Sequence, residues 1–309
     1  MAESRPDLSV LVVNWNTSAQ TLACLRSVTE QMQGIEYELI VVDNASSDGS
    51  AEAIRAANLP RLRLIESPVN TGFVGGNNLA AAQARGRYWL LLNSDTLVLS
   101  ADTGRIIDHL DQHPEVAVVG GPVVDEQGQM QFPGRRFPSP WVVFLVNTLR
   151  RVTKIETPAY RRFMCRDIAA DTMAEVDWIM GAYLYVRADL VRGAPLLDER
   201  IFMYYEDTLL CHRLKQQGYK IRYLPHAPVL HAHGVSARKA RAATIHYCFE
   251  ASQVYLRTRY GSLLAGGYRA LARLTWGMFA MLFGLAGRCG HAKSIEKGRL
   301  FRELLTWKP

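Results

Sequence analysis

Residues 88–95 read Tyr-Trp-Leu-Leu-Leu-Asn-Ser-Asp, a run of apolar side chains that ends abruptly in polar ones. Three earlier runs have a similar form, at 9–13, 38–43 and 62–67. Stretches with helical spacing of apolar residues separate them, at about 20–32, 49–58 and 73–86. The runs lack the period of two that marks a half-buried strand, which indicates strands covered on both faces. Strands that alternate with helices of this length predict an α/β fold with a mostly parallel sheet.

Beyond residue 100 the pattern loosens. The segments predicted there are a helix at 101–112, strands at 116–121, 179–186 and 221–224, and a helix at 207–217. From residue 237 onward only helical patterns occur. We therefore expect an α/β domain over 1–236, with halves at about 1–100 and 101–236, followed by a basic helical extension over 237–309.

The net formal charge of +7 is unevenly distributed along the chain. Residues 238–309 hold 13 Lys and Arg against 3 Asp and Glu, whereas residues 1–237 hold 23 against 26. The basic excess thus lies in the last quarter of the chain, and its expected partner is an anionic membrane surface. Nucleic acid is the weaker alternative, because basic and aromatic residues do not interleave on a predicted sheet or recognition helix.

The five cysteines are scattered, odd in number and without a Cys-x-x-Cys pair, which is typical of reduced thiols in a cytosolic protein. Residues 1–8 lack the basic and apolar regions of a signal peptide. The best apolar stretch, at 274–287, is too short to cross a bilayer and is bounded by Arg273 and Arg288. These features predict a cytoplasmic protein that is peripheral at the inner face of the cell membrane.

Each of the first four predicted strands runs into a polar motif. The motifs begin with Asn14-Trp15-Asn16, Asp43-Asn44-Ala45, Asn70-Thr71-Gly72 and Asn93-Ser94-Asp95. Turns are rich in the same residue types, so one such motif alone would mean little. Four in order fall on one edge of a parallel sheet, outside the carboxyl ends of the strands, where ligands bind. The candidate ligand contacts are Asn16, Asp43, Asp48, Asn70, Gly72 and Asp95.

These candidates differ in what their side chains offer. Asp43 ends the second strand, where its carboxylate can accept the ring N–H of a pyrimidine base. Asp48 is balanced between a ligand contact and a helix cap. The stretch 70–78 is rich in glycine, which lets the backbone approach a ligand, but it matches neither the dinucleotide fingerprint nor the phosphate loop. Asn77 and Asn78 are interpreted as braces of the turn and of the helix start.

Asp95 directly follows the fourth strand. Beside a diphosphate, a carboxylate there can bind Mg²⁺ or Mn²⁺, which prefer hard oxygen ligands. Such an ion neutralises the charge that develops on a leaving diphosphate. A lone Asp after a strand is usually a cap, and the position of Asp95 among the other motifs favours the metal.

Together the motifs give residues 8–236 a resemblance to family 2 glycosyltransferases, especially to the branch with bacterial rhamnosyltransferases. They are Asn-Trp-Asn, Asp-Asn-x-Ser-x-Asp-Gly-Ser, Asn-x-Gly-Phe-x-x-Gly-x-Asn and Leu-Leu-Asn-Ser-Asp. The resemblance implies the GT-A (Rossmann-like) fold, a nucleoside-diphosphate sugar as donor and a metal bound by Asp95. Asn93 replaces the first Asp of the family's metal motif, so fewer charged ligands would hold the ion.

The resemblance continues on the acceptor side. Residues 202–207 resemble the segment with the catalytic base, which implies Asp207 as that base and Glu206 as its neighbour. The alternative is a purely structural role, in which the dipole at the start of a helix favours a pair of carboxylates. The family's second Asp, two residues after the base, is here Leu209, which implies the loss of a supporting contact.

Three further segments complete the comparison with the family. His231 begins a match to His-x-x-Gly-x-Ser and implies a metal ligand or a diphosphate contact, with His233 the weaker candidate. Either histidine could equally be an ordinary core or surface group. Residues 178–182 resemble the acceptor-side strand and turn. The basic, aromatic stretch 132–166 is either a solvated loop or a flap that meets a lipid-linked pyrophosphate.

The function implied by the resemblance is a single displacement with inversion at the anomeric carbon. dTDP-rhamnose is the first candidate donor and UDP-sugars come next. The implied acceptor is a glycan, expected to be a lipid-linked glycan of the cell envelope. The alternative from another class is a catalytically silent nucleotide-sugar binding subunit, which the retention of Asp95 and Asp207 disfavours.

Overall fold

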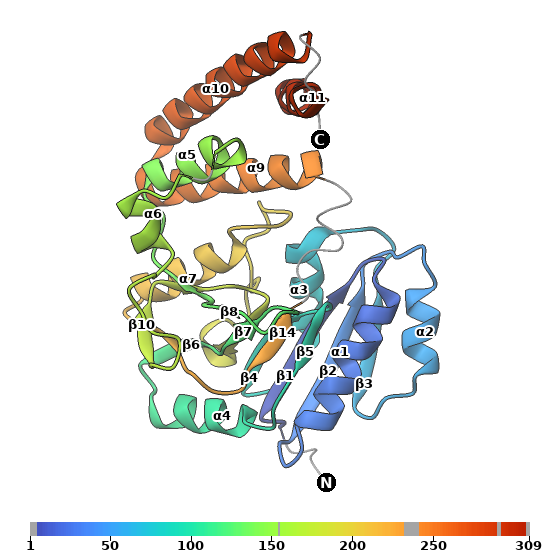
Figure 1. Ribbon diagram of the computed structural model, residues 1–309. Helices are drawn as coiled ribbons and strands as arrows, with labels where there is room; N and C mark the ends of the chain where they lie inside the picture. The colour runs from blue at the N-terminus through green and yellow to red at the C-terminus, as the bar shows by residue number, and fades with distance from the viewer. Residues whose placement is uncertain (1–4, 154, 232–240, 289–291, 307–309) are drawn as a thin grey trace. The chain divides into compact units, whose positions relative to one another are not determined.

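The computed structural model of the chain describes residues 5–153, 155–231, 241–288 and 292–306. The chain forms two compact units (Figure 1). The first, which we call the sheet unit, consists of residues 1–137 and 164–236. The second, the helical unit, consists of residues 138–163 and 237–309. The segment 138–163, grouped with the α/β domain in the sequence analysis, thus packs with the C-terminal helices.

The sheet unit is built on a central sheet of eight strands, in the order β10-β13-β6-β12-β4-β1-β2-β3. The four runs first recognised in the sequence form β1 (Leu8–Asn14), β2 (Tyr37–Asp43), β3 (Leu62–Glu66) and β4 (Tyr88–Asn93). The others are β6 (Val116–Gly120), β10 (Ala174–Val176), β12 (Tyr183–Arg187) and β13 (Lys220–Tyr223). β1 pairs in parallel with β2 and β4, and β2 with β3, whereas β12 is antiparallel to β4 and β6. The predicted α/β class with a mostly parallel sheet is confirmed.

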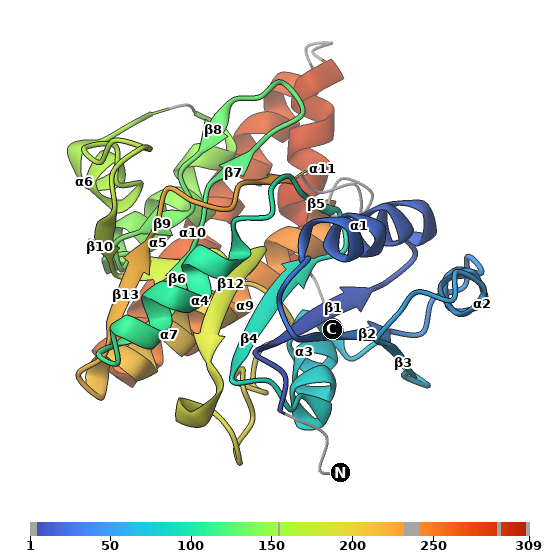
Figure 2. The ribbon, with the colours of Figure 1, turned by 90° about the horizontal axis from the view of Figure 1, so that it is seen from below.

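Helices cover both faces of this sheet (Figure 2). They are α1 (Ser18–Gln31), α2 (Ser50–Ala56), α3 (Gly72–Gln83), α4 (Thr103–Gln112) and α7 (Glu206–Gln216). Leu25 of α1 and Leu110 of α4 belong to one buried cluster with Val12 of β1. On the opposite face, Gly76 of α3 lies against Val13. Burial on both faces explains why these strands do not alternate apolar and polar residues.

The run predicted as a single strand at 179–186 is divided in the structure. Trp178–Ile179 form β11, which pairs with β9 (Gly134–Arg135) in a separate ladder, and Tyr183 begins β12 in the central sheet. Between them the backbone turns, with Tyr183 N donating to Met180 O at 3.3 Å. The apolar pattern of this run carries no signal for such a turn apart from Gly181, although the family resemblance implied a strand and turn at 178–182. The turn brings Gly181 and Ala182 to the edge of the sheet where the polar motifs lie.

A small second sheet positions the histidine motif. Its strands are β5 (Thr96–Val98), β14 (Val229–His231), β7 (Val123–Val124) and β8 (Met130–Gln131), in the order β5-β14-β7-β8. In the antiparallel register of β14 with β5, His231 lies opposite Thr96. Because Thr96 directly follows Asp95, this pairing sets His231 beside the end of β4.

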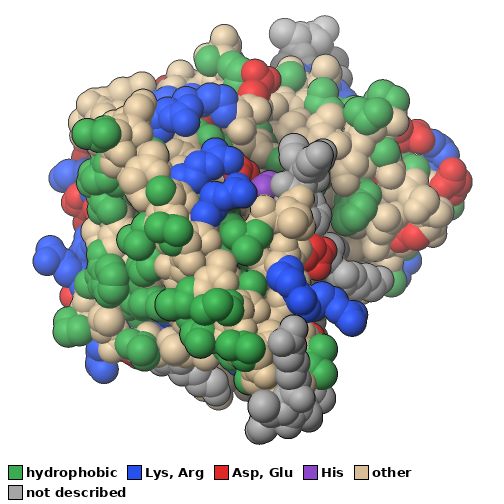
Figure 3. All heavy atoms as spheres, turned by 90° about the horizontal axis from the view of Figure 1, so that it is seen from above, with side chains coloured by type: hydrophobic (Ala, Val, Ile, Leu, Met, Phe, Trp, Pro, Cys, Tyr) green, Lys and Arg blue, Asp and Glu red, His purple; other side chains and the backbone are tan. Residues whose placement is uncertain are grey.

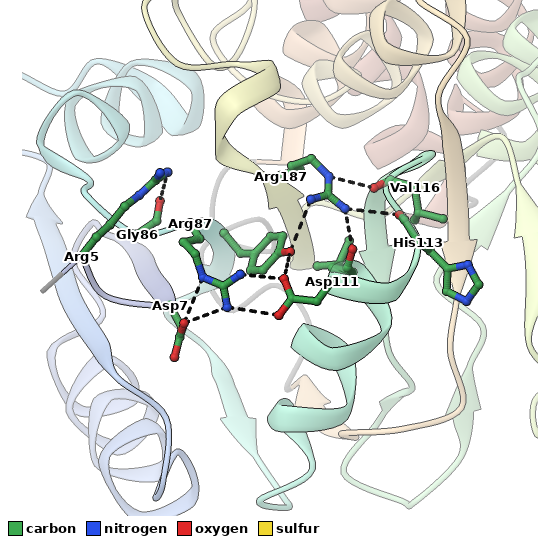
Figure 4. Close-up of polar contacts among 10 residues, drawn as sticks. Arg5, Asp7, Gly86, Arg87, Asp111, His113, Val116 and Arg187 are labelled. Atoms are coloured by element: carbon green, nitrogen blue, oxygen red, sulfur yellow. Dashed lines mark hydrogen bonds and ion pairs between the residues drawn. The ribbon is translucent and has the colours of Figure 1, made fainter.

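At the other end of the central sheet, a network of charged side chains ties α4 to the strands (Figure 4). Arg87 lies between two carboxylates, 2.8 Å from Asp7 and 2.6 Å from Asp111. Asp111 also accepts a hydrogen bond from the hydroxyl of Tyr88 at 2.6 Å. Arg187 donates to the carbonyl of Leu110, near the end of α4, at 2.5 Å. The network lies at the opposite end of the strands from the polar motifs, so its role is to stabilise the fold.

The helical unit consists of α5 (Pro140–Asn147), η1 (Leu149–Arg151), α6 (Pro158–Phe163), α9 (Arg241–Tyr260), α10 (Ser262–Arg288) and α11 (Ala292–Thr306). Pro140 and the Ser139 hydroxyl, which accepts from Val142 N, provide a standard helix start for α5. Asn147 at the end of α5 donates to the Tyr268 hydroxyl of α10 at 3.0 Å. This buried bond helps explain why 138–163 packs with the later helices.

Candidate functional site

The loops after β1 and β2 are joined by hydrogen bonds between motif side chains. Asn14 Nδ2 donates to Asp43 Oδ1 at 2.6 Å, and Ser46 N donates to Asp43 Oδ2 at 3.1 Å. Asn16, at φ 53°, accepts from Ser47 N through its Oδ1 at 2.7 Å. Each Asp43 oxygen retains a second lone pair for a ligand. The buried Asp43 therefore shapes the loop and stays able to accept a base N–H.

Asp48 has the contacts of a cap. Its carboxylate accepts from Ser50 N at 3.1 Å and Ser18 N at 3.2 Å, and the Ser50 hydroxyl also donates to it. Asp48 is exposed, and the desolvation that opposes its ionisation is outweighed by these hydrogen bonds, which lower the pKa of Asp48 below its usual value. These contacts favour the capping interpretation of Asp48.

The glycine-rich loop is braced by Asn44, a residue that the sequence analysis quoted but did not single out. Asn44 Nδ2 donates to Asn70 Oδ1 at 3.0 Å and to Gly72 O at 2.9 Å, and its Oδ1 accepts from Thr71 N at 2.9 Å. Its position directly after Asp43 was the only signal in the sequence. Asn78 also braces, because it exchanges hydrogen bonds with the backbone of Leu197.

Gly72 joins this loop to the segment that precedes α7. Its φ of +75° is in the left-handed region, and a Cβ added there would lie 2.4 Å from the carbonyl oxygen of Phe202. The same carbonyl accepts from Val74 N at 3.2 Å. Only glycine fits this position without displacing Phe202. The predicted donor loop and the predicted base segment are therefore in direct contact.

Asp95 and His231, the two candidate metal ligands, come together at the end of β4. Asp95 Oδ1 lies 3.2 Å from His231 Nε2, and Asn93 Nδ2 lies 3.4 Å from the same nitrogen. The Oδ1 atom of Asn93 is buried and has no hydrogen-bond partner among the described residues. His233, the weaker candidate, lies outside the described residues.

The donor set at this point fits a divalent cation. A carboxylate, an imidazole and an amide oxygen are acceptable ligands of Mn²⁺, and Mg²⁺ prefers the oxygens. Within the described part of the chain, no three His, Cys, Asp or Glu side chains gather in one place. An ion here would thus depend on Asn93 Oδ1, on the diphosphate and on water for its remaining ligands.

Asp207, at the start of α7, has both carboxylate oxygens held by backbone N–H groups. Oδ2 accepts from Gly181 N at 2.9 Å and Oδ1 accepts from Thr208 N at 2.6 Å. Burial raises the pKa of Asp207, while these hydrogen bonds and the charge of Arg135 oppose the shift. These contacts fix the orientation of the carboxylate. Leu209, at the position of the family's second Asp, is buried and apolar and gives the carboxylate no polar contact.

Glu206 is in a different state from its neighbour. Its side chain is buried, and Oε2 has no hydrogen-bond partner among the described residues. Burial, followed by the negative charge of Asp207, raises the pKa of Glu206 well above its usual range. Of the two carboxyl groups, Asp207 has the hydrogen bonds that stabilise a carboxylate and Glu206 Oε2 has none among the described residues, so Asp207 is the better candidate for the group that accepts a proton.

The chain before α7 is strained in a way that the sequence does not reveal. Tyr204 and Tyr205 have φ angles of 71° and 62°, a region that residues with side chains seldom adopt. Two such residues in succession cost on the order of 1–3 kcal/mol each, and such strain clusters at functional sites. The strained turn presents Glu206 and Asp207 at the first turn of α7, where the helix dipole favours negative charge.

One short turn links the two halves of the site. Asn93 N, at the end of β4, donates to Ala182 O at 3.0 Å, and the preceding residue, Gly181, donates to Asp207. The cluster of Asn93, Asp95 and His231 and the carboxyl pair of α7 thus share the turn 180–182. Asp43, Asn70 and Gly72 lie at or just after the ends of β2 and β3, which run parallel to β1 and β4, so one edge of the sheet holds most of the predicted site residues.

The sequence model of the family described as Glycosyl transferase family 2 matches residues 9–169 of this chain. The curated relatives include an N-acetylglucosaminyl-diphospho-decaprenol L-rhamnosyltransferase of Mycobacterium tuberculosis (strain CDC 1551 / Oshkosh), 25% identical over 284 residues that cover 82% of this chain and 83% of that protein. They also include the rhamnosyltransferase WbbL of Escherichia coli (strain K12), 27% identical over 211 residues that cover 65% of this chain and 70% of that protein.

Two solved structures resemble the fold. The mannosyltransferase PcManGT from Pyrobaculum calidifontis, in complex with GDP-Man and Mn²⁺, has a TM-score of 0.51 and 17% identity, over 98% of this chain and 86% of that one. GalNAc-T7 with UDP, GalNAc and Mn²⁺ has a TM-score of 0.54 and 14% identity, over 76% of this chain and 44% of that one. At such low identity these likenesses bear on the fold alone, and the predicted GT-A fold is confirmed.

Proposed function

The chain belongs to glycosyl transferase family 2, and we propose that it transfers rhamnose from dTDP-rhamnose to a lipid-linked glycan of the cell envelope, at the cytoplasmic face of the membrane. The names of the two rhamnosyltransferase relatives support this choice of sugar, and the decaprenol-linked substrate named for one of them supports the lipid-linked acceptor. A UDP-sugar is the second candidate donor. Asp43 is suited to either nucleotide, because uracil and thymine carry the same ring N–H.

The observation that carries the proposal is the shared turn at 180–182. Asn93 on the metal side and Asp207 on the acceptor side both bond to its backbone. A transfer reaction needs a stabilised leaving diphosphate and a base for the incoming hydroxyl in a fixed relation to each other. A turn that is hydrogen-bonded to both groups supplies that relation, which a subunit that only bound the nucleotide sugar would not need.

We assign the metal site to Asp95, His231 and Asn93 Oδ1. The Mn²⁺ in both similar structures supports a divalent ion, and the orphaned amide oxygen of Asn93 supports its place. When bound, Mg²⁺ or Mn²⁺ would neutralise charge on the diphosphate as the glycosidic bond to it breaks. Asp95, His231 and Asn93 would hold the ion in place. Asn70 and Gly72, from the neighbouring loop, are the proposed contacts to the donor.

We assign Asp207 as the base of an inverting reaction. The acceptor hydroxyl oxygen forms the new bond to the anomeric carbon, its proton passes to Asp207, and the nucleoside diphosphate leaves on the opposite side. The backbone bonds from Gly181 and Thr208 orient the carboxylate. Oδ1 also accepts from the Thr208 hydroxyl at 3.2 Å, so Oδ2 is the oxygen with a further lone pair for the proton. The burial that raises the pKa of Glu206 disfavours a second negative charge beside the base.

The test is a thermal-stability screen of nucleotide sugars with and without Mn²⁺, followed by mass spectrometry of products with a lipid-linked acceptor. The proposal predicts the largest metal-dependent stabilisation with dTDP-rhamnose and a product heavier by one deoxyhexose. Stabilisation without any glycosylated product would favour the silent binding subunit. A product with another sugar would retain the transferase and correct the donor.

A further inference from the structure

The net charges of the two units differ more than those of the chain segments 1–237 and 238–309. The helical unit holds 18 Lys and Arg against 4 Asp and Glu, a net formal charge of +14. The sheet unit holds 18 against 25, a net charge of −7. The segment 138–163 thus adds its cations to those of the C-terminal helices. Such a field attracts an anionic surface and repels another copy of the same unit.

One helix of this unit also exposes a continuous apolar face. Leu263, Leu274 and Met281 of α10 are 92%, 72% and 61% exposed. The other exposed apolar side chains of the helix are Leu264, Leu271, Met278, Leu282 and Leu285. Their spacing of three and four places them along one side of the helix, which we call the α10 stripe. Figure 3 shows hydrophobic side chains (green) gathered on this side of the molecule, with Lys and Arg (blue) beside them.

The stripe is not the core-facing side of α10. That side consists of Tyr268, Ala272, Trp276 and Phe279, which are buried. The Trp276 ring lies 4.7 Å from that of Phe249 in α9, and the Phe279 ring lies 5.1 Å from that of Phe301 in α11. A helix that is apolar on almost every side normally lies in a core or in a membrane. Since only 22% of its most apolar window is buried, α10 is not a core helix.

Length alone would allow α10 to cross a bilayer. Residues 262–287 are the one described segment long and apolar enough to do so, which corrects the expectation that the apolar stretch is confined to 274–287. The difference arises because the helix continues through the small residues Ala265, Gly266 and Gly267. Its other contacts argue against crossing, because α9 and α11 pack on its buried side and carry the exposed cations Arg257 and Arg299. Crossing would bring these charges into hydrocarbon or strip the helix of its partners.

We propose that α10 lies in the plane of an anionic membrane surface, with the α10 stripe inserted among the acyl chains and the cations of the helical unit meeting the headgroups. An interfacial helix buries its apolar face at the boundary of headgroup and acyl chain, and anionic lipid adds electrostatic attraction. A second copy of the chain would also cover the stripe, but it would set two units of +14 against each other. The inference concerns the helical unit and does not depend on which sugar the sheet unit transfers.

The test uses the full chain with vesicles of phosphatidylcholine, with or without an equal part of phosphatidylglycerol. The stripe variant carries Leu274→Gln and Met281→Gln, which remove apolar surface without changing the charge. The control variant carries Gly266→Gln and Gly277→Gln, in the same helix, where an added Cβ meets nothing within 4 Å. Donor-induced thermal stabilisation, measured for each protein, reports that the sheet unit is intact.

We expect wild type and control to bind the mixed vesicles and to be partly released by salt, and the stripe variant to bind about tenfold more weakly or worse, since each inserted side chain contributes through its buried apolar area. Equal binding of the stripe variant and wild type would overturn the proposal. The proposal would also be overturned if wild type failed to bind the mixed vesicles. The same holds if wild type formed a dimer without lipid and the stripe variant were monomeric.

Discussion

Asp207→Asn is the substitution that best tests the assigned base. The structure indicates that it changes the hydrogen bonds of this side chain as well as its charge. The carboxylate accepts from Gly181 N and from Thr208 N through different oxygens. An amide has one acceptor oxygen, so one of the two N–H groups must face an NH₂ donor. A buried donor left without its acceptor costs about 1–3 kcal/mol. We therefore expect a loss of stability of that size, apart from any effect on catalysis.

The catalytic effect should exceed this structural one. Removal of a general base lowers the rate on the order of a hundredfold or more. Glu206→Gln replaces a buried carboxyl group, whose pKa burial raises, by a neutral amide of the same shape, so it should change kcat by only a few-fold. Thr208→Val is the structural control, because it removes the hydroxyl that donates to Asp207 at 3.2 Å and keeps the carboxylate.

The assay is kcat for transfer at saturating donor, beside a donor Kd from calorimetry and the folded fraction from thermal unfolding. In wild type, kcat should fall as the pH drops through the pKa of Asp207, which burial sets above the usual value of about 4. That acid limb should be absent from the residual activity of Asp207→Asn. If Asp207→Asn is nearly as active as wild type while Glu206→Gln is inactive, the base is Glu206. If both variants are active, the base lies elsewhere.

Three further predictions concern the metal, the donor loop and the fold. Asp95→Ala should abolish transfer and the metal dependence of donor binding, and full activity of this variant in EDTA would refute the metal role. Gly72→Ala forces a Cβ to within 2.4 Å of the Phe202 carbonyl oxygen, and the displaced base segment should lower kcat at least about tenfold. Gly104→Ala, where a Cβ meets nothing within 4 Å, should leave kcat unchanged. Equal kcat values for the two variants would exclude a link between Gly72 and the base segment. Asp111→Asn should destabilise the fold at neutral pH by about 1 kcal/mol, a figure suited to a half-exposed ion pair. Hydrogen bonds from Arg87 lower the pKa of Asp111, so its contribution is present at neutral pH and is lost as the pH falls below about 4; a difference in unfolding free energy that persists in acid would contradict this origin.

The sequence predicted the part of the fold in which local pattern and tertiary role agree. Runs such as 88–93 are apolar because both sheet faces are covered, and the residues after them are polar because they meet at an open edge. The prediction failed where one run serves two sheets. Residues 179–186 are continuously apolar, yet they turn at 180–182, because Asp207 and Asn93 bond to the backbone there. Those partners are distant in sequence, so no local window contains the cause.

The candidate site shows the same division. Asp43, Asn70 and Asp95 could be predicted as candidates because polar residues follow strands at those positions, whereas the role of Asp207 was implied by the family resemblance. Asn44 was passed over because a bracing amide has the same signature as a turn residue. The left-handed backbone at 204–205 carries no signal in its residues, since tyrosine is an ordinary loop residue and the conformation is imposed by packing.

The contact between Gly72 and Phe202 gives the donor loop a route to the acceptor side. Gly72 O is held by Asn44, which follows Asp43, and Val74 N binds the Phe202 carbonyl. Two residues beyond Phe202 the strained backbone begins, and it ends at the first turn of α7. Any shift of the loop at 70–74 on binding a nucleotide must therefore move this strained segment or break its hydrogen bond. Because strained backbone persists only where its surroundings hold it in place, occupancy of the donor loop and the orientation of Asp207 should be coupled.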